Sequence, residues 1–278
     1  SDVYKRQHEI FSLICNFNVK NETFFIENLI FMQEPKILGI IPARWGSTRF
    51  PGKPLHIIAG KPLIQHVWER AKESMLLEKV IIATDDNRIK EAAESFGAIV
   101  TMTSDTHLSG TDRIAEAMGE ESNCTHVLNI QGDEPLIDSS LINQLCEKLS
   151  KNPGICMITA AMLIKNDLDL ANPNVVKTII DKHNNAIYFS RSLIPYQTSE
   201  NPAATCFRHK GIYGYTKDFL LKFVRWDPSP LELTESLEQL RAIENGEKIH
   251  VVITEDDSIG VDTPEQALIV ENQILRKN

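Results

Sequence analysis

The sequence has few of the features that would place it in a membrane or outside the cell. Its apolar runs have the length of strands or are interrupted by charge, and none reaches the roughly 18 residues of a spanning helix. Cysteines are few, odd in number and without a C-x-x-C pair: Cys15, Cys124, Cys146, Cys156 and Cys206. This usage predicts neither a disulfide framework nor a structural zinc site, and it favours a reducing, cytoplasmic location without membrane contact.

Positive charge is also in deficit. The chain has 29 Lys and Arg against 38 Asp and Glu, for a net charge of −9. Nucleic-acid binding normally needs a basic face, so nucleic acid is not an expected partner. A few clustered cations can still bind an anionic small molecule locally. With 42% apolar residues among 278, the chain is long and apolar enough for a folded globular domain.

Residues 1–35 lack the periodicity of the rest. A basic pair followed by the apolar stretch 10–17 resembles a signal peptide, but the stretch is short, contains polar residues and precedes no small-residue cleavage site. Two interpretations stay open: a leader in front of a natural start at Met32, or an extra helix packed on the outside. We therefore separate 1–35, a leader of uncertain origin, from a domain at 36–278.

Strands and helices alternate from residue 36 onward. Continuous apolar runs, typical of strands buried on both faces, occupy 36–41, 79–84, 98–102 and 126–131. Helical spacing follows at 62–74, around 92–97 and at 111–119. This order predicts βαβ units and hence an α/β fold with a mostly parallel, doubly wound sheet.

The second half of the domain changes character. Strand-like segments follow one another closely at 155–164, 175–181, 185–189 and 209–216. We expect a smaller antiparallel layer there, over about 154–216. Helices are expected at 217–226 and 234–245, a last strand at 248–254, and a final helix capped by Thr263.

The loop 42–55 holds the most distinctive chemistry. Arg44, Arg49 and Lys53 fall within ten residues that also contain Gly46 and Gly52. The loop leaves the C-terminal end of the first strand, where open α/β sheets bind ligands. Glycines let backbone N–H groups approach a phosphate, and the cations neutralise its charge. The alternative is a solvated basic turn, and the spacing is neither a dinucleotide fingerprint nor a Walker loop.

Two aspartates are candidate metal ligands. Asp133 follows the strand that ends at Gln131, and Asp262 follows the strand-like segment 259–261. Carboxyl ends of parallel strands share one edge, so both carboxylates should lie near the cationic loop. Mg²⁺ is usually held by one or two carboxylates together with phosphate oxygens. The alternative for each aspartate is a turn or helix-start residue.

Ordered motifs run through nearly all of residues 36–278. They are ARWGSTRFPGKPL at 43–55, HLSGTDR at 107–113, NIQGDEP at 129–135, YFSR at 188–191, RHKGIYGY at 208–215, PSPLE at 228–232, ESLEQLR at 235–241 and GVDTPE at 260–265. In this order they resemble sugar-nucleotide cytidylyltransferases, and most narrowly the 3-deoxy-manno-octulosonate (Kdo) cytidylyltransferase family. Trp45 and Phe50 stand where that family more often has other residues.

The resemblance implies a nucleotide-diphospho-sugar transferase-like fold. It also implies transfer of a cytidylyl group from CTP to Kdo, an acidic eight-carbon sugar. Products would be CMP-Kdo, for lipopolysaccharide biosynthesis, and pyrophosphate; Mg²⁺ and a homodimer are implied as well. Two alternatives stay open: a cytidylyltransferase for another acidic sugar, such as 8-amino-Kdo or sialic acid, and a catalytically silent nucleotide-binding protein.

The resemblance also implies residue roles. The catalytic residues would be Arg44, Arg49, Lys53, Asp133 and Asp262, with the two aspartates holding the metal. Nucleotide-binding residues would be Ala43, Arg44, Ser109, Arg113 and Gln131. Residues lining the sugar pocket would be Gln131, Arg191, His209, Tyr213, Glu238 and Gln239.

Several of these residues have plainer interpretations. Arg191 could form a surface ion pair, and His209 could be a structural hydrogen-bonding histidine. Glu238 and Gln239 could belong to the solvated face of the helix expected at 234–245. Asp112, next to Arg113, could be a first-turn carboxylate that complements the helix dipole.

Overall fold

The structure, a computed structural model, describes residues 35–46, 50–121, 123–196, 198 and 205–277. The chain divides into two units, Ser1–Pro35 and Lys36–Asn278, and everything below concerns the second. The expectations for the leader and for Arg49 fall outside the described residues.

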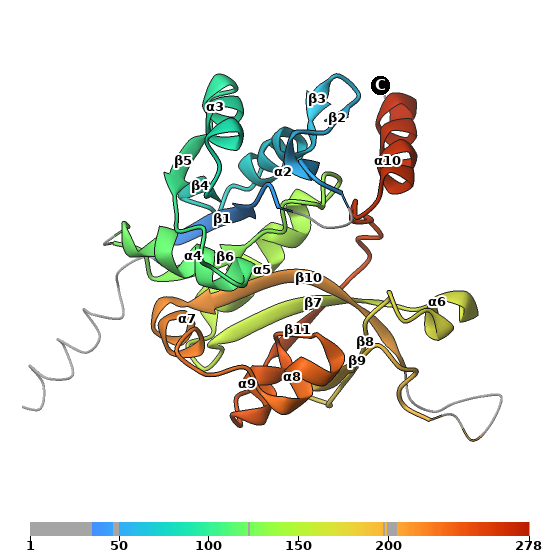
Figure 1. The fold of residues 1–278 in the computed structure, drawn as a ribbon. Coiled ribbons are helices and arrows are strands. Elements are labelled where there is room, and N and C mark those ends of the chain that lie inside the picture. The colour runs from blue at the N-terminus through green and yellow to red at the C-terminus, as the bar shows by residue number, and fades with distance from the viewer. Residues whose placement is uncertain (1–34, 47–49, 122, 197, 199–204, 278) are drawn as a thin grey trace, which may run out of the picture. The chain divides into compact units, whose positions relative to one another are not determined.

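One mixed sheet organises the domain, in the order β11-β7-β10-β6-β1-β4-β5 (Figure 1). The parallel half consists of β1 (Ile37–Ala43), β4 (Lys79–Thr84), β5 (Ile99–Met102) and β6 (His126–Asn129). These are the four strands that the apolar runs predict. The α/β fold with a mostly parallel sheet in this half is therefore confirmed.

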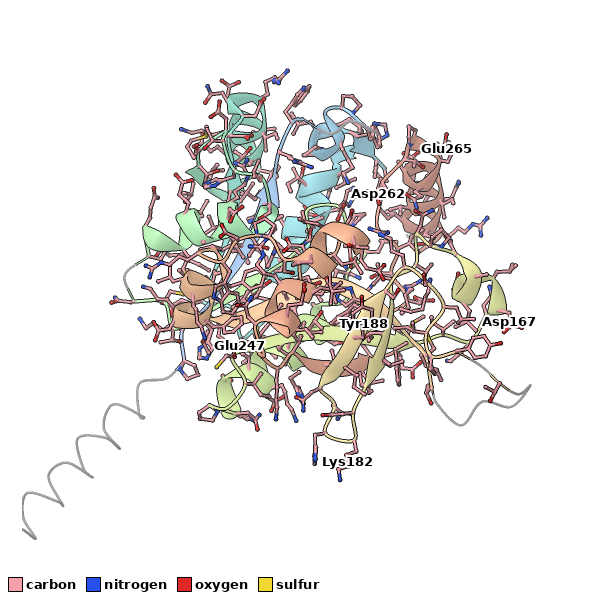
Figure 2. All side chains as sticks on the ribbon, turned by 60° about the horizontal axis from the view of Figure 1, so that its bottom comes forward. Asp167, Lys182, Tyr188, Glu247, Asp262 and Glu265 are labelled. Carbon is pink, nitrogen blue, oxygen red and sulfur yellow. The ribbon has the colours of Figure 1, made fainter. Side chains whose placement is uncertain are left out.

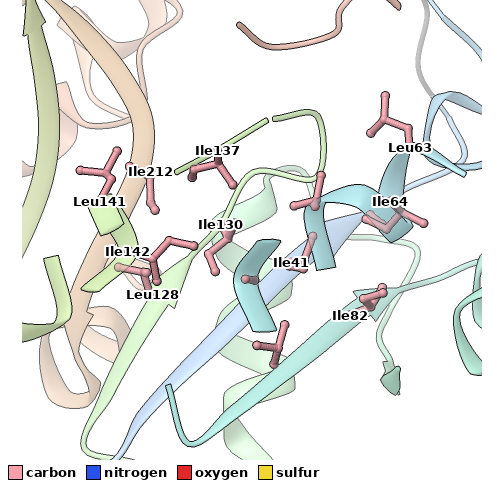
Figure 3. Packing of buried hydrophobic residues seen from close by; sticks show 14 of the residues in the cluster. Ile41, Leu63, Ile64, Ile82, Leu128, Ile130, Ile137, Leu141, Ile142 and Ile212 are labelled. Carbon is pink, nitrogen blue, oxygen red and sulfur yellow. The ribbon is translucent and has the colours of Figure 1, made fainter. Parts of the chain in front are cut away.

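Both faces of β1 are buried. Ile37 and Ile41 belong to one apolar cluster, while Leu38 and Ile40, which point the other way, belong to a second. Helices cover the first face with α2 (Leu63–Lys72), α3 (Asn87–Ser95), α5 (Ser139–Lys151) and α10 (Pro264–Lys277), and the second with α4 (Gly110–Gly119), α7 (Lys217–Phe223) and α9 (Leu240–Glu244). Figure 3 shows the first cluster, in which Ile64 of α2 lies near Ile41. In the described part of the chain, every helix is too short or too polar to cross a bilayer.

The antiparallel strands extend this sheet. β10 (Phe207–Thr216) runs antiparallel to β6 on one side and to β7 (Met157–Leu163) on the other. Its first residues also pair with β8 (Lys177–Ile180), which pairs in turn with β9 (Ala186–Ser190). At the edge, β11 (His250–Thr254) is parallel to β7. The expected antiparallel layer is thus joined to the parallel half through β10.

Five elements are not anticipated from the sequence. They are η1 (Lys53–Leu55), the hairpin of β2 (Ile57–Ile58) and β3 (Lys61–Pro62), α5, and α6 (Asp167–Ala171). A local signal for α5 does exist: the Asp138 side chain caps it by accepting from the backbone N–H of Ser140 at 2.8 Å.

The prediction of a single helix at 234–245 is wrong. The chain instead forms α8 (Pro230–Glu235), a left-handed residue at Ser236 with φ 53°, and then α9. The Arg191 side chain, which follows β9, donates to the carbonyl oxygens of Glu235 at 2.8 Å and Ser236 at 3.4 Å. It thereby satisfies carbonyls left unpaired where α8 ends, which no local pattern reveals.

Candidate functional site

An open pocket of about 310 Å³ lies at the C-terminal ends of β1 and β6. It is lined by Pro42, Ala43, Arg44, Lys53, Pro54, His107, Leu108, Ser109, Gly110, Arg113, Gln131, Gly132, Asp133 and Asp262. The lining includes the described residues assigned above to catalysis and nucleotide binding: Ala43, Arg44, Lys53, Ser109, Arg113, Gln131, Asp133 and Asp262. Residues that the sequence analysis does not single out, such as Gly132, complete it.

Lys53 joins the two candidate metal ligands. Its ammonium Nζ lies 2.7 Å from Oδ2 of Asp133 and 3.2 Å from Oδ1 of Asp262. The lysine side chain is 15% exposed, against 30% and 43% for the two aspartates. The cationic loop and both strand-end carboxylates therefore meet at one point on the pocket wall.

The start of η1 depends on a glycine and an aromatic side chain. Gly52 has φ 70°, and its N–H donates to the carbonyl of Trp45 at 3.2 Å. A Cβ on Gly52 would lie 2.9 Å from Cη2 of Trp45, so the indole packs directly on the glycine. The Arg88 guanidinium also packs on this indole and lies 3.4 Å from the Trp45 ring centroid. This packing places Lys53 at the pocket.

The loop that carries Asp133 passes close to β1. A Cβ on Gly132 would lie 2.8 Å from the carbonyl oxygen of Pro42, a distance that leaves room only for glycine. The N–H of Val261 donates to the Asp133 carbonyl at 2.8 Å and so connects this loop with the one that carries Asp262.

Asp262 lies just before α10, whose first turn contains Glu265 (Figure 2). Thr263 and Gln266 cap this helix: the Gln266 side chain accepts from the N–H of Thr263 at 3.1 Å, and Thr263 Oγ1 accepts from the N–H of Gln266 at 3.4 Å. The predicted cap is confirmed. The Asp262 carboxylate is consequently directed to Lys53 and not used as the cap.

The two aspartates fit a magnesium ion that is bound together with a phosphate ligand. Among the described residues, no three His, Cys, Asp or Glu side chains gather closely enough to hold a metal by themselves. Mg²⁺ typically takes one or two carboxylates and completes its shell with phosphate oxygens and water. Since one ammonium contacts both carboxylates, a single cation can reach Asp133 and Asp262 together.

The N-terminus of α4 forms another wall of the pocket. Ser109 caps the helix in a reciprocal box with Asp112, so the interpretation of Asp112 as a first-turn carboxylate is confirmed. Arg113 is buried and held by Asp85 at 2.6 Å and by the hydroxyl of Thr103. Its guanidinium is therefore fixed in direction before any ligand binds.

Of the residues expected around the sugar, Gln131 lines this pocket, whereas Arg191, His209, Tyr213, Glu238 and Gln239 lie outside its lining. His209 and Tyr213 have ring centroids 5.3 Å apart, although four positions separate them on β10. The register of β10 against β7 shifts between Lys210 and Tyr213, and this bulge explains the approach of the rings.

Glu238 and Gln239 connect this second group to α4. Oε2 of Glu238 accepts from the hydroxyl of Thr111, which lies in the first turn of α4. Gln239 is only 4% exposed, so the interpretation of these residues as a solvated helix face is wrong. In the described part of the chain, Glu238 Oε1 and Gln239 Nε2 are buried without a hydrogen-bond partner. Polar atoms in this state are expected to meet a polar ligand or water.

Burial changes the protonation of this group. It lowers the pKa of His209 to about 3, with a further contribution from the Lys210 ammonium. It raises the pKa of Glu238 and that of Tyr213. His209 is thus neutral near pH 7 and hydrogen-bonds Thr159 Oγ1 at 3.0 Å, as a structural histidine would. It can orient a polar group but does not supply a positive charge.

Arg191 is held by main-chain carbonyls. Besides the bonds to Glu235 and Ser236, it donates to the carbonyl of Pro173 at 3.2 Å. The expected alternative of a surface ion pair is wrong, because carbonyl oxygens occupy the guanidinium. This arrangement fixes the segment between α8 and α9 that holds Glu238.

Comparison with known proteins identifies close relatives. The cytidylyltransferase family model matches residues 38–249. The 3-deoxy-manno-octulosonate cytidylyltransferase of Solibacter usitatus (strain Ellin6076) is 51% identical over 83% of this chain and 91% of its own length. That of Thermodesulfovibrio yellowstonii is 49% identical over 84% and 95%. The solved structure of CMP:2-keto-3-deoxy-manno-octonic acid synthetase complexed with CTP aligns with a TM-score of 0.83 and 38% identity, covering 87% of this chain and 100% of its own. A cytidylyltransferase from Leptospira borgpetersenii, 21% identical over 87% of each chain with a TM-score of 0.61, shares the fold.

Proposed function

The chain belongs to the cytidylyltransferase family, and from that premise we propose that it activates Kdo with CTP. The products are CMP-Kdo and pyrophosphate, and the activated sugar serves lipopolysaccharide synthesis. Relatives about half identical over more than four fifths of the chain carry the name 3-deoxy-manno-octulosonate cytidylyltransferase. The structural relative that contains CTP supports the same nucleotide.

One observation of the site carries the proposal: Lys53 lies between Asp133 and Asp262 on the wall of the pocket. Phosphoryl and nucleotidyl transfer depend on positioning and charge stabilisation more than on covalent catalysis. A cluster of two carboxylates, one lysine and the neighbouring Arg44 provides both signs of charge at one point. That combination suits a nucleoside triphosphate with its metal.

In the proposed reaction, the anomeric hydroxyl oxygen of the sugar attacks the α-phosphorus of CTP in line. The new bond joins that oxygen to phosphorus, the bond between the α-phosphorus and its bridging oxygen breaks, and pyrophosphate leaves. The hydroxyl proton passes to solvent. Arg44 and Lys53, with Arg49 assigned from its sequence position, bind the phosphates and stabilise the charge that develops on pyrophosphate.

Asp133 and Asp262 would hold the magnesium ion. When bound, Mg²⁺ neutralises phosphate charge and acidifies the attacking hydroxyl. Before it binds, the Lys53 ammonium neutralises the two carboxylates and keeps them together. With an ion held by these carboxylates, the Lys53 ammonium would be available to bind the triphosphate.

The group around Glu238 is proposed as the sugar site. Gln239 Nε2 and Glu238 Oε1 offer a donor and an acceptor that lack hydrogen-bond partners among the described residues, although Oε1 lies 3.6 Å from the Arg241 guanidinium. Tyr213 of β10 is within electrostatic reach of Glu238, its ring lies 5.3 Å from that of neutral His209, and both side chains can orient the sugar hydroxyls. Gln131, at the edge of the nucleotide pocket, faces the main chain of Gly211 and so borders both regions.

Two further parts of the proposal concern the state of the protein. Large apolar side chains of the antiparallel half are exposed, among them Leu168 at 77% and Ile187 at 53%, and a homodimer would cover them. Light scattering on the purified protein measures its oligomeric state.

The described cysteines are Cys124, Cys146, Cys156 and Cys206, and all are thiols. They support a reducing, cytoplasmic location.

The decisive experiment measures pyrophosphate release from CTP with candidate sugars, with and without Mg²⁺. Magnesium-dependent release with Kdo, and CMP-Kdo as the product, is the expected result. Release only with 8-amino-Kdo or sialic acid would reassign the substrate. No release with any 2-keto sugar acid would leave a nucleotide-binding protein and refute the proposed function.

A further inference from the structure

A buried lysine lies behind the catalytic pocket. Lys210 of β10 is 3% exposed, and its Nζ donates to the carbonyl oxygen of Ser258 at 2.7 Å and to the Ser258 hydroxyl at 2.8 Å. Two carboxylates complete its surroundings: Oε2 of Glu134 at 3.4 Å and Oδ2 of Asp256 at 3.7 Å. All three charged side chains are almost fully buried, so their interaction is weakly screened.

The partners of Lys210 come from the two loops that carry the aspartates. Glu134 immediately follows Asp133. Asp256 and Ser258 precede Asp262 in the segment between β11 and α10. One ammonium therefore holds both loops from behind, while Lys53 contacts their two aspartates from the pocket.

The segment around Ser258 is rigid on the Lys210 side. Oδ1 of Asp256 accepts from the N–H of Ser258 at 2.9 Å, and Oδ2 accepts from its hydroxyl at 3.0 Å. Arg208 Nη2 adds a bond of 3.2 Å to the Ser258 carbonyl. Lys210 is therefore connected, through its bonds to Ser258, with the segment that leads to Asp262.

A bulge in β10 begins directly after Lys210, whose side chain contacts Glu134 and Ser258. Lys210 pairs with Ala160 and Tyr213 with Thr159, so Gly211 and Ile212 stand outside the pairing with β7. The hydroxyl of Thr159 bonds the carbonyls of Lys210 at 3.2 Å and Ile212 at 2.7 Å.

The same bulge brings the main chain of β10 against the Asp133 loop. A Cβ on Gly211 would lie 3.4 Å from Cγ of Gln131 and 3.8 Å from Oε1 of Glu134. The strand that holds Lys210 and the loop that holds Asp133 are thus in direct contact, which leaves little freedom for either to move alone.

We propose that Lys210 is a positioning residue that holds Asp133 and Asp262 at the separation at which one Mg²⁺ ion reaches both. The inference rests on the proposed function, which supplies the metal and the nucleotide. Without the ammonium, Glu134 and Asp256 are two buried carboxylates whose common counter-charge is gone, and their loops separate. A displacement of about 1 Å at such a site is enough to reduce turnover about 10²-fold.

The test is the variant Lys210→Met, which keeps the length of the side chain and removes the charge. Calorimetry measures the Kd of CTP with and without Mg²⁺, and a pyrophosphate assay measures kcat. We expect the Kd with Mg²⁺ to rise at least about tenfold and kcat to fall about 10²-fold. The Kd without metal should change less than about twofold, since Lys210 does not touch the nucleotide pocket.

Lys177→Met is the matched control for the loss of a buried ammonium. Lys177 is 0% exposed, and its Nζ donates to the main-chain carbonyls of Asn172, Val175 and Arg191, on neither aspartate loop. The variant Lys177→Met should be less stable in urea than wild type. Its ratio of the CTP Kd without Mg²⁺ to the CTP Kd with Mg²⁺ should equal that of wild type. An unchanged ratio in Lys210→Met as well would overturn the proposal.

Glu134→Gln keeps the test valid if Lys210→Met does not fold. It removes one carboxylate of the pair while keeping its shape, and it should raise the Kd with Mg²⁺ several-fold. The double variant should be no worse than Lys210→Met, because both changes break one interaction; additive losses would contradict the coupling. A wild-type chain that releases no pyrophosphate refutes the proposed function alone, since the Mg²⁺-dependence of CTP binding still tests Lys210.

Discussion

Lys53 and Asp262 are 209 positions apart in the sequence, yet the ammonium of one lies 3.2 Å from the carboxylate of the other. The same ammonium bonds Asp133 at 2.7 Å. Two acidic groups that would repel each other are therefore kept side by side by a lysine from a third segment. This arrangement supports the proposal that a divalent cation and the phosphates that accompany it bind here.

Replacing Asp262 by asparagine should abolish turnover and leave the fold nearly intact. The side chain is 43% exposed, so the change costs little stability, while the metal loses one of two carboxylates. We expect kcat to fall at least about 10³-fold and the urea midpoint to stay within error of wild type. Asp257→Asn, an exposed aspartate of the same loop, is the control and should retain wild-type turnover. Wild-type turnover in Asp262→Asn would refute its role in metal binding.

Lys53→Gln should weaken both CTP binding and turnover. The lysine contacts both aspartates, and its loss leaves their charges opposed and the phosphates less well neutralised. A drop in kcat/KM of about 10²- to 10³-fold is expected, comparable to the loss of one charge-stabilising donor. Lys61→Gln, which removes a lysine from an exposed pair with Glu69, should leave kcat/KM unchanged. Equal kinetics in the two variants would contradict the assignment.

Gly52→Ala should disturb the start of η1. Alanine at φ 70° costs about 1–2 kcal/mol, and its methyl group would meet the Trp45 indole at 2.9 Å. Urea unfolding should show that loss, and the Kd of CTP should rise because Lys53 follows directly. Gly154→Ala, away from the pocket, is the control: among the described residues nothing lies within 4 Å of its Cβ position, and its φ is not in the left-handed region. Tight CTP binding in Gly52→Ala would show that the contact with Trp45 does not position the loop.

His209 should make stability depend on pH in a defined window. Its pKa falls from 6.5 to about 3 on folding because it is buried, so below pH 6.5 the unfolded chain takes up a proton that the folded chain does not. The contribution of His209 to the free energy of unfolding is complete above pH 6.5. It is lost as pH falls toward 3, by up to about 1.4 kcal/mol per pH unit. Urea unfolding at pH 7.5, 6 and 5 measures the slope.

The variant His209→Gln should show a shallower decline over the same range. Carboxylates titrate there too, so the quantity that counts is the difference between the two curves. His183→Gln, an exposed histidine in the turn before β9, serves as the control and should follow wild type. Parallel curves for wild type and His209→Gln would mean that folding does not lower the pKa of His209.

Local patterns predict the parallel half of the fold well. β1 and β4 are buried on both faces, so each reads as an uninterrupted apolar run whatever its neighbours are. The break at Ser236 could not be predicted in this way. It depends on a left-handed residue and on the guanidinium of Arg191, which arrives from β9, 45 positions away.

The sequence by itself indicated the family, through motifs that resemble it, and it named eight of the residues that line the pocket. Those motifs are local, so they are readable without coordinates. Only the tertiary structure decided that His209 is neutral, that Gln239 is buried and that Lys210 holds both aspartate loops. The reason is physical: burial and charge pairing are properties of residues distant in the chain, and they arise only when the strands that carry those residues are packed together.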